Sequence, residues 1–206
     1  MPTSLESRGS LETLVLEPPF QPLMSEAANE YFGELLSPTD LVCEYGCGSS
    51  TIWLAERTAK VYSVEHDPVW HGIVARAIEE QKIANVQLNL VVPAVGGNLR
   101  EAAKRYSEFL LNFPDDHFDI IYLDGWRPSR PAAPAIAKDK VRPGGWLVID
   151  NLEWSPVVNG IKFAGIESWE RYRCSGKTAG YIPGISIGPL VCHAGFYQRP
   201  ETDSHA

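Results

Sequence analysis

The sequence predicts an α/β fold of three layers, with a central sheet of seven strands that is parallel apart from one antiparallel strand. Short apolar runs alternate with stretches of helical periodicity, which is the pattern of successive βαβ units. The run at Phe118–Leu123 (FDIIYL) is almost continuously apolar, as in a parallel strand that is buried on both faces. The length of 206 residues and the hydrophobic content of 44% suit one domain with a normal core.

Local signals place the elements of the alternating part. Apolar runs bounded by glycine or polar residues predict five strands, at Leu41–Tyr45, Lys60–Glu65, Val86–Val92, Phe118–Leu123 and Trp146–Ile149. Segments with one apolar face predict five helices, at Ser25–Leu36, Ser50–Arg57, Asp67–Gln81, Leu99–Leu111 and Pro131–Lys140. Ser25 and Asp67 stand where a side-chain oxygen caps a helix. The turn Pro143-Gly144-Gly145 precedes the fifth strand.

The end of the chain changes character. Glu167–Cys174 and Leu190–Gln198 are predicted as two more strands, and no helix separates them, so they can pair antiparallel. The Gly/Pro-rich loop Ser175–Pro189 between them has a length typical of lids and of disordered segments. We therefore expect a single domain over residues 1–206. Its expected parts are an N-terminal segment and helix at 1–36, a core at 40–151, a strand pair on the substrate side at 152–200, and a mobile tail at 201–206.

Charge and composition disfavour several classes of partner. Lys and Arg number 18 against 26 Asp and Glu, a formal net charge of −8, which argues against nucleic acid and against anionic membrane surfaces. No apolar run reaches the ~18 residues that span a bilayer, and residues 1–9 lack the pattern of a secretory signal. The four cysteines form no CxxC pair, which is typical of a reduced, cytoplasmic protein; they are Cys43, Cys47, Cys174 and Cys192. The sequence leaves open whether the chain forms a homodimer.

A glycine turn follows the first predicted strand and precedes the next helix. Its sequence EYGCGSST contains Gly46 and Gly48, which allow a sharp turn and the close approach of a ligand. Glu65 ends the following strand, where a carboxylate accepts hydrogen bonds from both hydroxyls of a ribose. A dinucleotide site would need a third glycine in the place of Thr51. The hydroxyls of Ser50 and Thr51 instead suit a nucleoside cofactor with an amino-acid tail.

Four motifs together resemble those of a known family. In chain order they are VCEYGCGSST, SVEHD, FDIIYLDG and VRPGGWLVIDN. The set resembles the class I S-adenosylmethionine-dependent methyltransferases, whose fold is Rossmann-like, from about Asp40 to Asn151. The resemblance implies S-adenosyl-L-methionine as cofactor, with the glycine turn along its methionine part, Glu65 on its ribose, and His66 and the segment near Pro93–Val95 at its adenine. The implied cofactor-binding residues are Glu44, Gly46, Gly48, Ser50, Thr51, Glu65, His66 and Asp124.

Three polar residues follow the fourth and fifth predicted strands. Asp124 ends one strand and Asp150 and Asn151 end the other, so all three are expected at the same edge of the sheet. Carboxylate and amide oxygens suit Mg²⁺ or Ca²⁺. The pattern resembles the metal-dependent catechol-type O-methyltransferases, which implies a divalent cation that binds a substrate hydroxyl and lowers its pKa. Alternatively, Asp124 contacts the cofactor or a substrate amine, and Asp150 and Asn151 cap the segment after the strand.

Asp124, Arg127 and His193 are the candidate catalytic residues. Arg127 stands where the metal-dependent group has a lysine that acts as base, but an arginine stays protonated and can only stabilise an anion or bind an acidic substrate. His193 lies on the last predicted strand, and a histidine has a suitable pKa for a general base. Trp126 and Trp154 follow strands four and five, where they either wall a substrate pocket or pack in the core.

These features together predict methyl transfer from S-adenosylmethionine to an oxygen or nitrogen of a small molecule. The methyltransferase core uses almost the whole chain, so little remains that could recognise a macromolecule. Two alternatives stay open. One is an NAD(P)-dependent oxidoreductase, which Thr51 and the turn before the fifth strand disfavour. The other is a noncatalytic cofactor-binding subunit, which the missing lysine base would fit.

Overall fold

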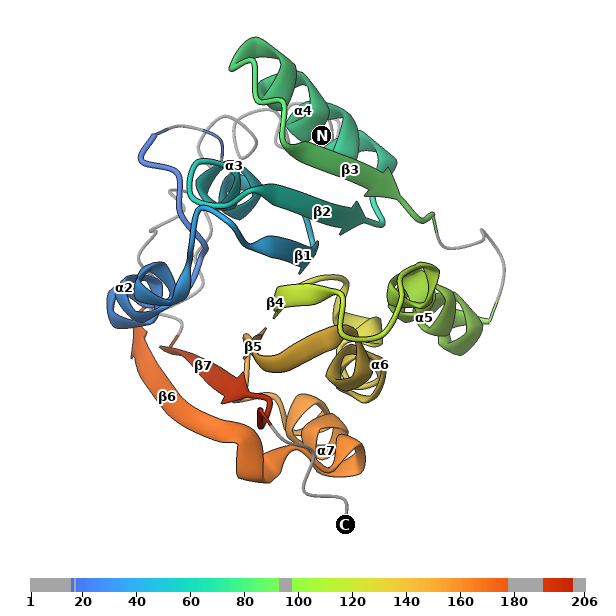
Figure 1. Cartoon of the computed structure of the whole chain (residues 1–206). Helices are drawn as coiled ribbons and strands as arrows, with labels where there is room; N and C mark the ends of the chain where they lie inside the picture. Colours follow the sequence, from blue (N-terminus) through green and yellow to red (C-terminus); the bar gives the residue numbers. More distant parts are fainter. Residues whose placement is uncertain (1–15, 17, 93–97, 178–190, 202–206) are drawn as a thin grey trace.

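Seven strands form one sheet, in the order β3-β2-β1-β4-β5-β7-β6 (Figure 1). The computed structural model describes residues 16, 18–92, 98–177 and 191–201. The strands are β1 Leu41–Tyr45, β2 Lys60–Glu65, β3 Val86–Leu90, β4 Phe118–Leu123, β5 Val141–Ile149, β6 Glu170–Lys177 and β7 Val191–Gln198. Strand β7 runs antiparallel to both of its neighbours, whereas the other paired strands are parallel. The predicted fold class is confirmed.

Some of the predicted segments lie outside the described residues. They are the adenine-side segment Pro93–Val95, residues 178–189 of the proposed lid loop, most of the N-terminal segment, and the tail after Glu201.

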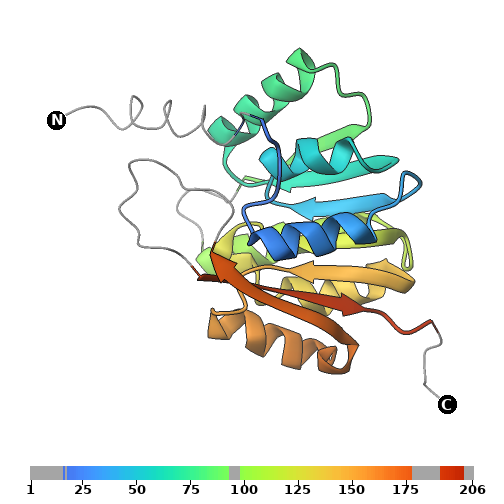
Figure 2. The same cartoon turned by 90° about the vertical axis from the view of Figure 1, so that its left-hand side faces the viewer.

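Helices cover the sheet from both sides. They are α2 Glu26–Leu35, α3 Ser49–Ala55, α4 Pro68–Glu80, α5 Leu99–Ser107, α6 Ala133–Lys140 and α7 Ser155–Ala164, with short 3₁₀ turns at Glu108–Asn112, Arg127–Ser129 and Glu167–Trp169. One buried cluster lies between the sheet and the pair α2 and α3, and Figure 2 looks onto this face. A second cluster lies between the opposite face and α5, α6 and α7. The predicted three layers are therefore present.

The two predicted helix caps are confirmed. Ser25 Oγ accepts a hydrogen bond from the backbone N–H of Ala28 at 3.3 Å. Asp67 Oδ1 accepts one from the N–H of Val69 at 2.8 Å, and a proline follows Asp67 at the first position of α4. Both caps satisfy N–H groups that the first turn of a helix leaves unpaired.

The parallel register brings the ends of the central strands level with one another. Tyr45 at the end of β1 pairs with Val64 of β2 and with Leu123 of β4. Leu123 in turn pairs with Ile149 of β5. Each residue that follows a strand end, from the turn after β1 to the loop after β5, therefore starts at the same carboxyl edge of the sheet.

Strand β5 is longer than the predicted Trp146–Ile149. It begins at Val141, which pairs with Phe118, and a register shift follows before Ile120 pairs with Trp146. The residues predicted as a turn are thus an irregular part of the strand, held by bonds of 2.9 Å from Gly144 N to Arg199 O and from Arg199 N to Gly145 O. A positive φ of 75° at Gly144 explains why the segment has the composition of a turn.

No helix is predicted at Ser155–Ala164, yet helix α7 lies there. Pro156 and Gly160 weaken the helical signal of this segment. Pro156 is tolerated because it stands in the first turn, where the N–H is unpaired in any helix. Gly160 is required because a Cβ would lie 2.2 Å from the carbonyl oxygen of Pro131, so α7 packs closer to the loop before α6 than any other residue would allow. Tertiary packing overrides the local signal here.

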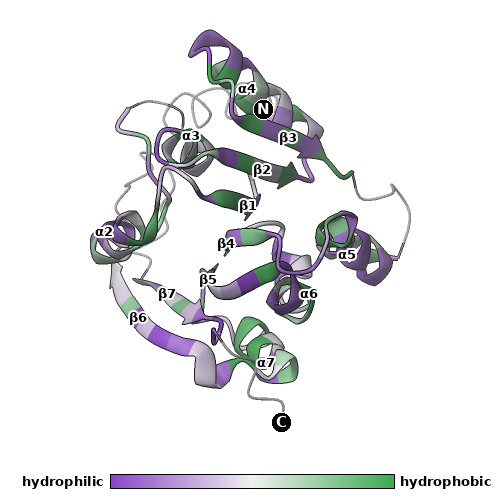
Figure 3. Ribbon diagram, in the orientation of Figure 1, coloured by the Kyte–Doolittle hydropathy of each residue, from purple (hydrophilic) through white to green (hydrophobic). Residues whose placement is uncertain are grey.

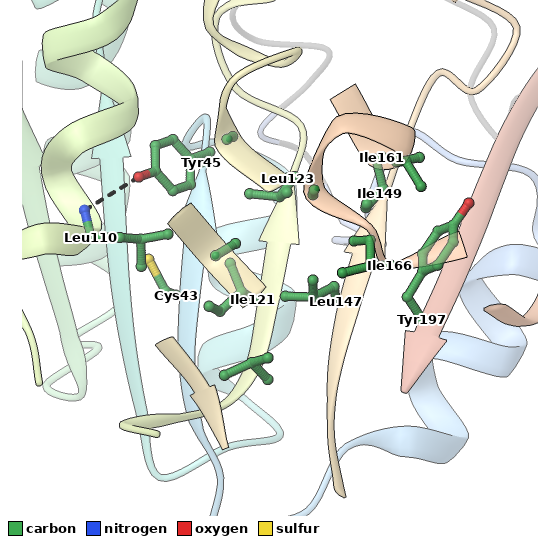
Figure 4. Packing of buried hydrophobic residues seen from close by; sticks show 14 of the residues in the cluster. Cys43, Tyr45, Leu110, Ile121, Leu123, Leu147, Ile149, Ile161, Ile166 and Tyr197 are labelled. Atoms are coloured by element: carbon green, nitrogen blue, oxygen red, sulfur yellow. Dashed lines mark hydrogen bonds between the residues drawn. The ribbon is translucent and has the colours of Figure 1, made fainter. Parts of the chain in front are cut away.

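The larger buried cluster holds α5, α6 and α7 on the sheet. Figure 4 shows Cys43, Ile121 and Leu147 of neighbouring strands pointing to this side, with Tyr45 among them. The hydroxyl of Tyr45 donates to Ser107 O at 2.7 Å and accepts from Leu110 N at 3.3 Å, so it ties the end of α5 to β1. The outer strand β6 is mostly hydrophilic (Figure 3). None of the helices in the described part of the chain has the length and apolar character needed to cross a membrane.

Replacing Tyr45 by phenylalanine is expected to lower the free energy of unfolding by about 1–3 kcal/mol, because two buried backbone groups lose their partner. Urea unfolding followed by circular dichroism measures the change. Tyr62→Phe is the matched control, since the Tyr62 hydroxyl bonds to none of the described residues and should cost less. Equal losses in the two variants would contradict the role of the Tyr45 hydroxyl.

Candidate functional site

The turn after β1 touches the loop after β4 at a glycine. Gly46 has a φ of 87°, which L residues rarely adopt. A Cβ at this position would lie 3.0 Å from the carbonyl oxygen of Asp124 and 3.0 Å from the Cα of Gly125. The backbone of Gly46 is also tied to β2, because its N–H donates to Val64 O at 2.9 Å. A glycine is thus required where the two loops meet.

Glu44 is fully buried beneath this turn and is held by three hydroxyls. Thr51 Oγ1 donates to its carboxylate at 2.6 Å and Ser63 Oγ at 2.7 Å, while Ser50 Oγ donates to the other carboxylate oxygen. Thr51 Oγ1 also accepts from Gly48 N at 2.9 Å. The hydroxyls of Ser50 and Thr51 are therefore directed at Glu44, not at a bound molecule. Cofactor contacts of this turn through its backbone remain a prediction.

Burial dominates the electrostatics of Glu44. Loss of water raises the pKa of its carboxyl from 4.5 to about 7, although the three hydroxyls act in the opposite direction. The neighbouring charge of Asp124 adds to the rise. Glu44 thus shapes the glycine turn from below, and its protonation is coupled to the stability of the turn.

Glu65 ends β2 and accepts several N–H donors. Its Oε1 accepts from the backbone N–H of His66 at 2.7 Å and of Asp67 at 2.9 Å, and it lies 2.5 Å from Nδ1 of His66. Its Oε2 accepts from Cys47 N at 3.2 Å, which joins β2 to the glycine turn. Burial raises the pKa of Glu65, but the bonds from His66 and Asp67 outweigh it, and the pKa lies below the ordinary value. Glu65 is a buried carboxylate that stays ionised.

Three aromatic rings gather beside Glu65. The ring of His66 stacks on that of Trp126, with centroids 5.3 Å apart and an angle of 21°. Tyr106 of α5 meets both rings edge-on, at 6.0 Å from His66 and 6.2 Å from Trp126. The Tyr106 hydroxyl donates to Val64 O at 2.8 Å. Trp126 therefore packs on a residue predicted at the adenine, and the cluster spans the ends of β2 and β4.

Arg130, which the sequence analysis did not single out, organises the loop after β4. Its Nη2 lies 2.7 Å from Asp124 Oδ1 and donates to Asp124 O at 2.7 Å, and its Nε donates to Gly125 O at 2.6 Å. Its Nη1 donates to the side-chain oxygen of Asn151. One guanidinium thus joins the loops after β4 and β5. The sequence alone could not single out Arg130 as the residue that joins these loops, because Arg127 follows the same strand and is an equally plausible candidate.

The residues at the strand ends do not fit a divalent cation. Of the three predicted ligands, Asp124 and Asn151 already use side-chain oxygens to bind the guanidinium of Arg130. An ion between them would meet that permanent positive charge. Across the residues that the structure describes, no group of three His, Cys, Asp or Glu side chains could hold a metal ion. The bonds to Arg130 therefore disfavour the predicted metal site at Asp124, Asp150 and Asn151, which stays a prediction.

Asp150 lies beside this pair without a comparable partner. Its side chain is buried, and Oδ1 makes no hydrogen bond to any described residue. Burial raises the pKa of Asp150 well above its ordinary value, and the charge of Asp124 raises it further. The alternative of a helix cap is also wrong, because the residue at the N-cap of α7 is Trp154.

The loop after β5 meets the start of β7 through Glu153. Asn151 Nδ2 donates to Glu153 Oε1 at 2.9 Å, and His193 N donates to Glu153 Oε2 at 3.2 Å. The carbonyl of His193 accepts from Leu152 N at 2.8 Å. The predicted residue His193 therefore stands next to the loop that carries Asp150 and Asn151.

Arg127 is placed by an aromatic contact between two loops. Its guanidinium carbon lies 4.5 Å from the centre of the Trp154 ring, a cation–π contact that joins the loops after β4 and β5. The structure thus brings Asp124, Arg127, Asp150, Asn151 and His193 to the loops at one end of β4, β5 and β7. Sequence reasoning missed Arg130 and Glu153 in this group.

A family of methyltransferase domains matches residues 43–152, just over half of the chain. The chain belongs to the class I S-adenosylmethionine-dependent methyltransferases. The match contains the glycine turn, Glu65 and the loops after β4 and β5 as far as Leu152, whereas Glu153, Trp154 and His193 lie beyond it.

The proteins similar to this methyltransferase have names that point to different methylation reactions. A probable cobalt-precorrin-6B C(15)-methyltransferase (decarboxylating) of Methanothermobacter thermautotrophicus is 27% identical over 112 residues, 53% of this chain and 51% of the relative. The chain thus matches about half the length of that relative. A putative O-methyltransferase from Klebsiella pneumoniae shares the fold at 18% identity, with a TM-score of 0.60 over 92% of this chain and 90% of the other.

A third similar protein is named for a nucleic acid substrate. The tRNA (m1A58) methyltransferase TrmI from Aquifex aeolicus has the same fold at 13% identity, with a TM-score of 0.56 over 91% of this chain and 75% of the other. At such identities the likeness concerns the fold, and the site must decide the substrate.

The two buried glutamates are expected to give opposite pH dependences of stability. The pKa of Glu44 is raised in the folded state, so folding binds a proton between about pH 4.5 and 7 and stability falls as the pH rises through that range. Glu44→Gln removes this loss, and the variant should gain about 3 kcal/mol relative to wild type between about pH 4.5 and 8. Urea unfolding across the pH range measures the difference.

Glu65→Gln is the matched control, because the pKa of Glu65 is lowered in the folded state. Glu65 therefore contributes stability above its unfolded pKa, and the contribution is lost as the pH falls through its folded pKa. The difference between wild type and Glu65→Gln should shrink on acidification below about pH 4.5. A Glu44→Gln difference that stays constant from about pH 4.5 to 8 would show that Glu44 titrates normally.

Proposed function

We propose that the chain transfers the methyl group of S-adenosylmethionine to an oxygen or nitrogen of a small molecule. The observation that carries the proposal is the ionised Glu65 at the end of β2, bonded through Oε2 to Cys47 N of the glycine turn at 3.2 Å. A fixed carboxylate beside a glycine turn is the arrangement that receives the ribose of a nucleoside cofactor. The family match supports the same cofactor.

In this proposal the cofactor lies along the carboxyl edge of β1, β2 and β4. Glu65 accepts hydrogen bonds from the ribose hydroxyls, and the adenine lies beside the stacked pair of His66 and Trp126. The backbone of the turn from Gly46 to Gly48 contacts the methionine part. Glu44 acts as a positioning residue, since its bonds to Ser50, Thr51 and Ser63 fix the turn from below.

When bound, S-adenosylmethionine supplies an electrophilic methyl group on a sulfonium. The lone pair of the acceptor forms the new bond to carbon, and the electrons of the carbon–sulfur bond stay on sulfur. The chain has to align the two partners and keep water out. Asp124, Arg127 and His193 are the proposed catalytic residues on the acceptor side. They lie on the loops after β4 and at the start of β7, next to the proposed position of the methyl group.

The proposal that the acceptor is a small molecule rests on the net charge of the chain. With a net charge of −8 the chain is poorly suited to a phosphate backbone, although a tRNA methyltransferase shares its fold. We also propose a cytoplasmic location, because Cys43, Cys47 and Cys174 are buried free thiols, as expected in a reducing compartment.

The match to methyltransferase domains decides against the alternative of an NAD(P)-dependent oxidoreductase. Against a noncatalytic cofactor-binding subunit stand Asp124, Asp150 and Arg130 at the end of the sheet where a methyl acceptor would bind. A subunit that only binds the cofactor would not need a buried carboxylate oxygen left without a donor.

Calorimetry with S-adenosylhomocysteine is expected to show binding to the wild-type chain and none with NAD. Glu65→Gln should weaken binding by about 10- to 100-fold, because bonds to a charged acceptor are replaced by bonds to a neutral one. Glu79→Gln, at an exposed position of α4, is the control and should bind as wild type does. Binding of NAD without binding of S-adenosylhomocysteine would refute the proposal.

A further inference from the structure

We propose that the methyl acceptor of this chain is an amine, which binds without a metal ion and donates an N–H hydrogen bond to Asp150. Arg130 takes the place of a metal ion by holding Asp124 and Asn151 together. The inference deepens the proposed function and rests on it.

Asp124 and Asp150 leave the sheet side by side. Leu123 of β4 pairs with Ile149 of β5, so the next residue of each strand starts at the same level. Side chains alternate along a strand, and Leu123 and Ile149 both point into the cluster beneath α5, α6 and α7. Asp124 and Asp150 therefore share the opposite side of the sheet end. Their charges also interact, since Asp124 raises the pKa of Asp150 and both acids raise the pKa of Tyr122.

Among the described residues, Arg130 is the cation bonded to Asp124, and no cation is bonded to Asp150. Its fork binds Asp124 twice, through the side chain and the carbonyl, and reaches across to Asn151. The side chain of Arg130 is 16% exposed, so the pair is largely shielded from water. A guanidinium never loses its proton under ordinary conditions. The site thus has a fixed positive charge between Asp124 and Asn151, two of the three residues predicted as metal ligands.

Within the described part of the chain, Asp150, unlike Asp124, has no bond to a positively charged side chain. Only 3% of the residue is exposed, and its Oδ1 has no hydrogen-bond partner among the described residues. A buried carboxylate oxygen without a donor is costly. A ligand that brings an N–H or O–H donor to Oδ1 would remove that cost, so this oxygen marks the acceptor side of the site.

Chemistry selects an amine over a hydroxyl. A hydroxyl is a poor nucleophile until it loses its proton, so its attack needs a proton transfer to Asp150 or His193 before the methyl group moves. An amine already carries the lone pair that attacks. The charges of two further carboxylates, Asp124 and Glu153, act on Asp150, and these acidic surroundings disfavour a carboxylate or a phosphate as the ligand.

The proposed methyl transfer to nitrogen needs no reactant besides the amine and S-adenosylmethionine. The nitrogen lone pair forms a bond to the methyl carbon, the carbon–sulfur bond breaks, and its electrons neutralise the sulfonium. The methylated nitrogen then holds one positive charge and one proton too many. That proton passes to the carboxylate of Asp150 and from there to water when the product leaves.

The first experiment measures binding of Mn²⁺ alone by calorimetry to the chain saturated with S-adenosylhomocysteine. No binding is expected for wild type. Arg130→Gln removes the internal cation and should gain Mn²⁺ binding at Asp124, Asp150 and Asn151. Arg127→Gln, which leaves the carboxylates with Arg130, is the matched control and should not gain it. Binding of Mn²⁺ to wild type, or activity that EDTA abolishes and Mg²⁺ restores, overturns the metal-free site.

The second experiment compares pairs of acceptors that differ in one atom, benzylamine with benzyl alcohol and aniline with phenol, in EDTA. Release of S-adenosylhomocysteine is expected for an amine and not for its alcohol. Asp150→Asn should lower kcat by about 100-fold or more while calorimetry shows unchanged binding of S-adenosylhomocysteine. Methyl transfer to an alcohol alone, to neither member of any pair, or at the wild-type rate in Asp150→Asn contradicts the amine assignment. Failure of S-adenosylhomocysteine to bind would instead refute the proposed function.

Discussion

The cost of burying carboxylates at the end of a parallel sheet is the constraint on which the rest of the site depends. Four acids lie at the ends of neighbouring strands, and each one is compensated differently. Glu44 has three hydroxyls, Glu65 has backbone N–H groups and a histidine, Asp124 has a guanidinium, and Asp150 has no donor for Oδ1. Since a carboxylate takes its properties from its partners, four chemically similar side chains acquire four distinct roles.

The compensating groups also hold the loops in place. The bond from Cys47 to Glu65 joins the turn after β1 to β2, and the absence of a side chain at Gly46 lets the same turn rest on the loop after β4. Arg130 then joins that loop to the loop after β5, through Asn151. The interactions that satisfy buried charge are therefore the ones that fix the spacing of the strand ends, and the geometry of the site follows from its electrostatics.

Much of the fold could be predicted from the sequence, because the buried strands carry strong local signals. Leu41–Tyr45, Lys60–Glu65 and Phe118–Leu123 are strands with the predicted bounds. Helix α7 could not be predicted, since Gly160 is chosen for its contact with Pro131 and not for helix propensity. Candidate site residues were identified by their positions at strand ends. Their partners were not, because the bonds of Arg130 span loops that only the folded chain brings together.

The possible ligands of the unpaired Asp150 oxygen differ in which unfavourable interactions of the free protein each would remove. A hydroxyl donor restores one hydrogen bond but leaves the repulsion between Asp150 and Asp124 in place. A divalent cation removes the repulsion, but it must displace Arg130 from Asp124 and Asn151 or lie against its charge. An amine donor restores the hydrogen bond, leaves Arg130 where it is, and carries the lone pair that attacks the methyl group without first losing a proton. It is therefore the ligand that satisfies the buried oxygen of Asp150 with the smallest rearrangement.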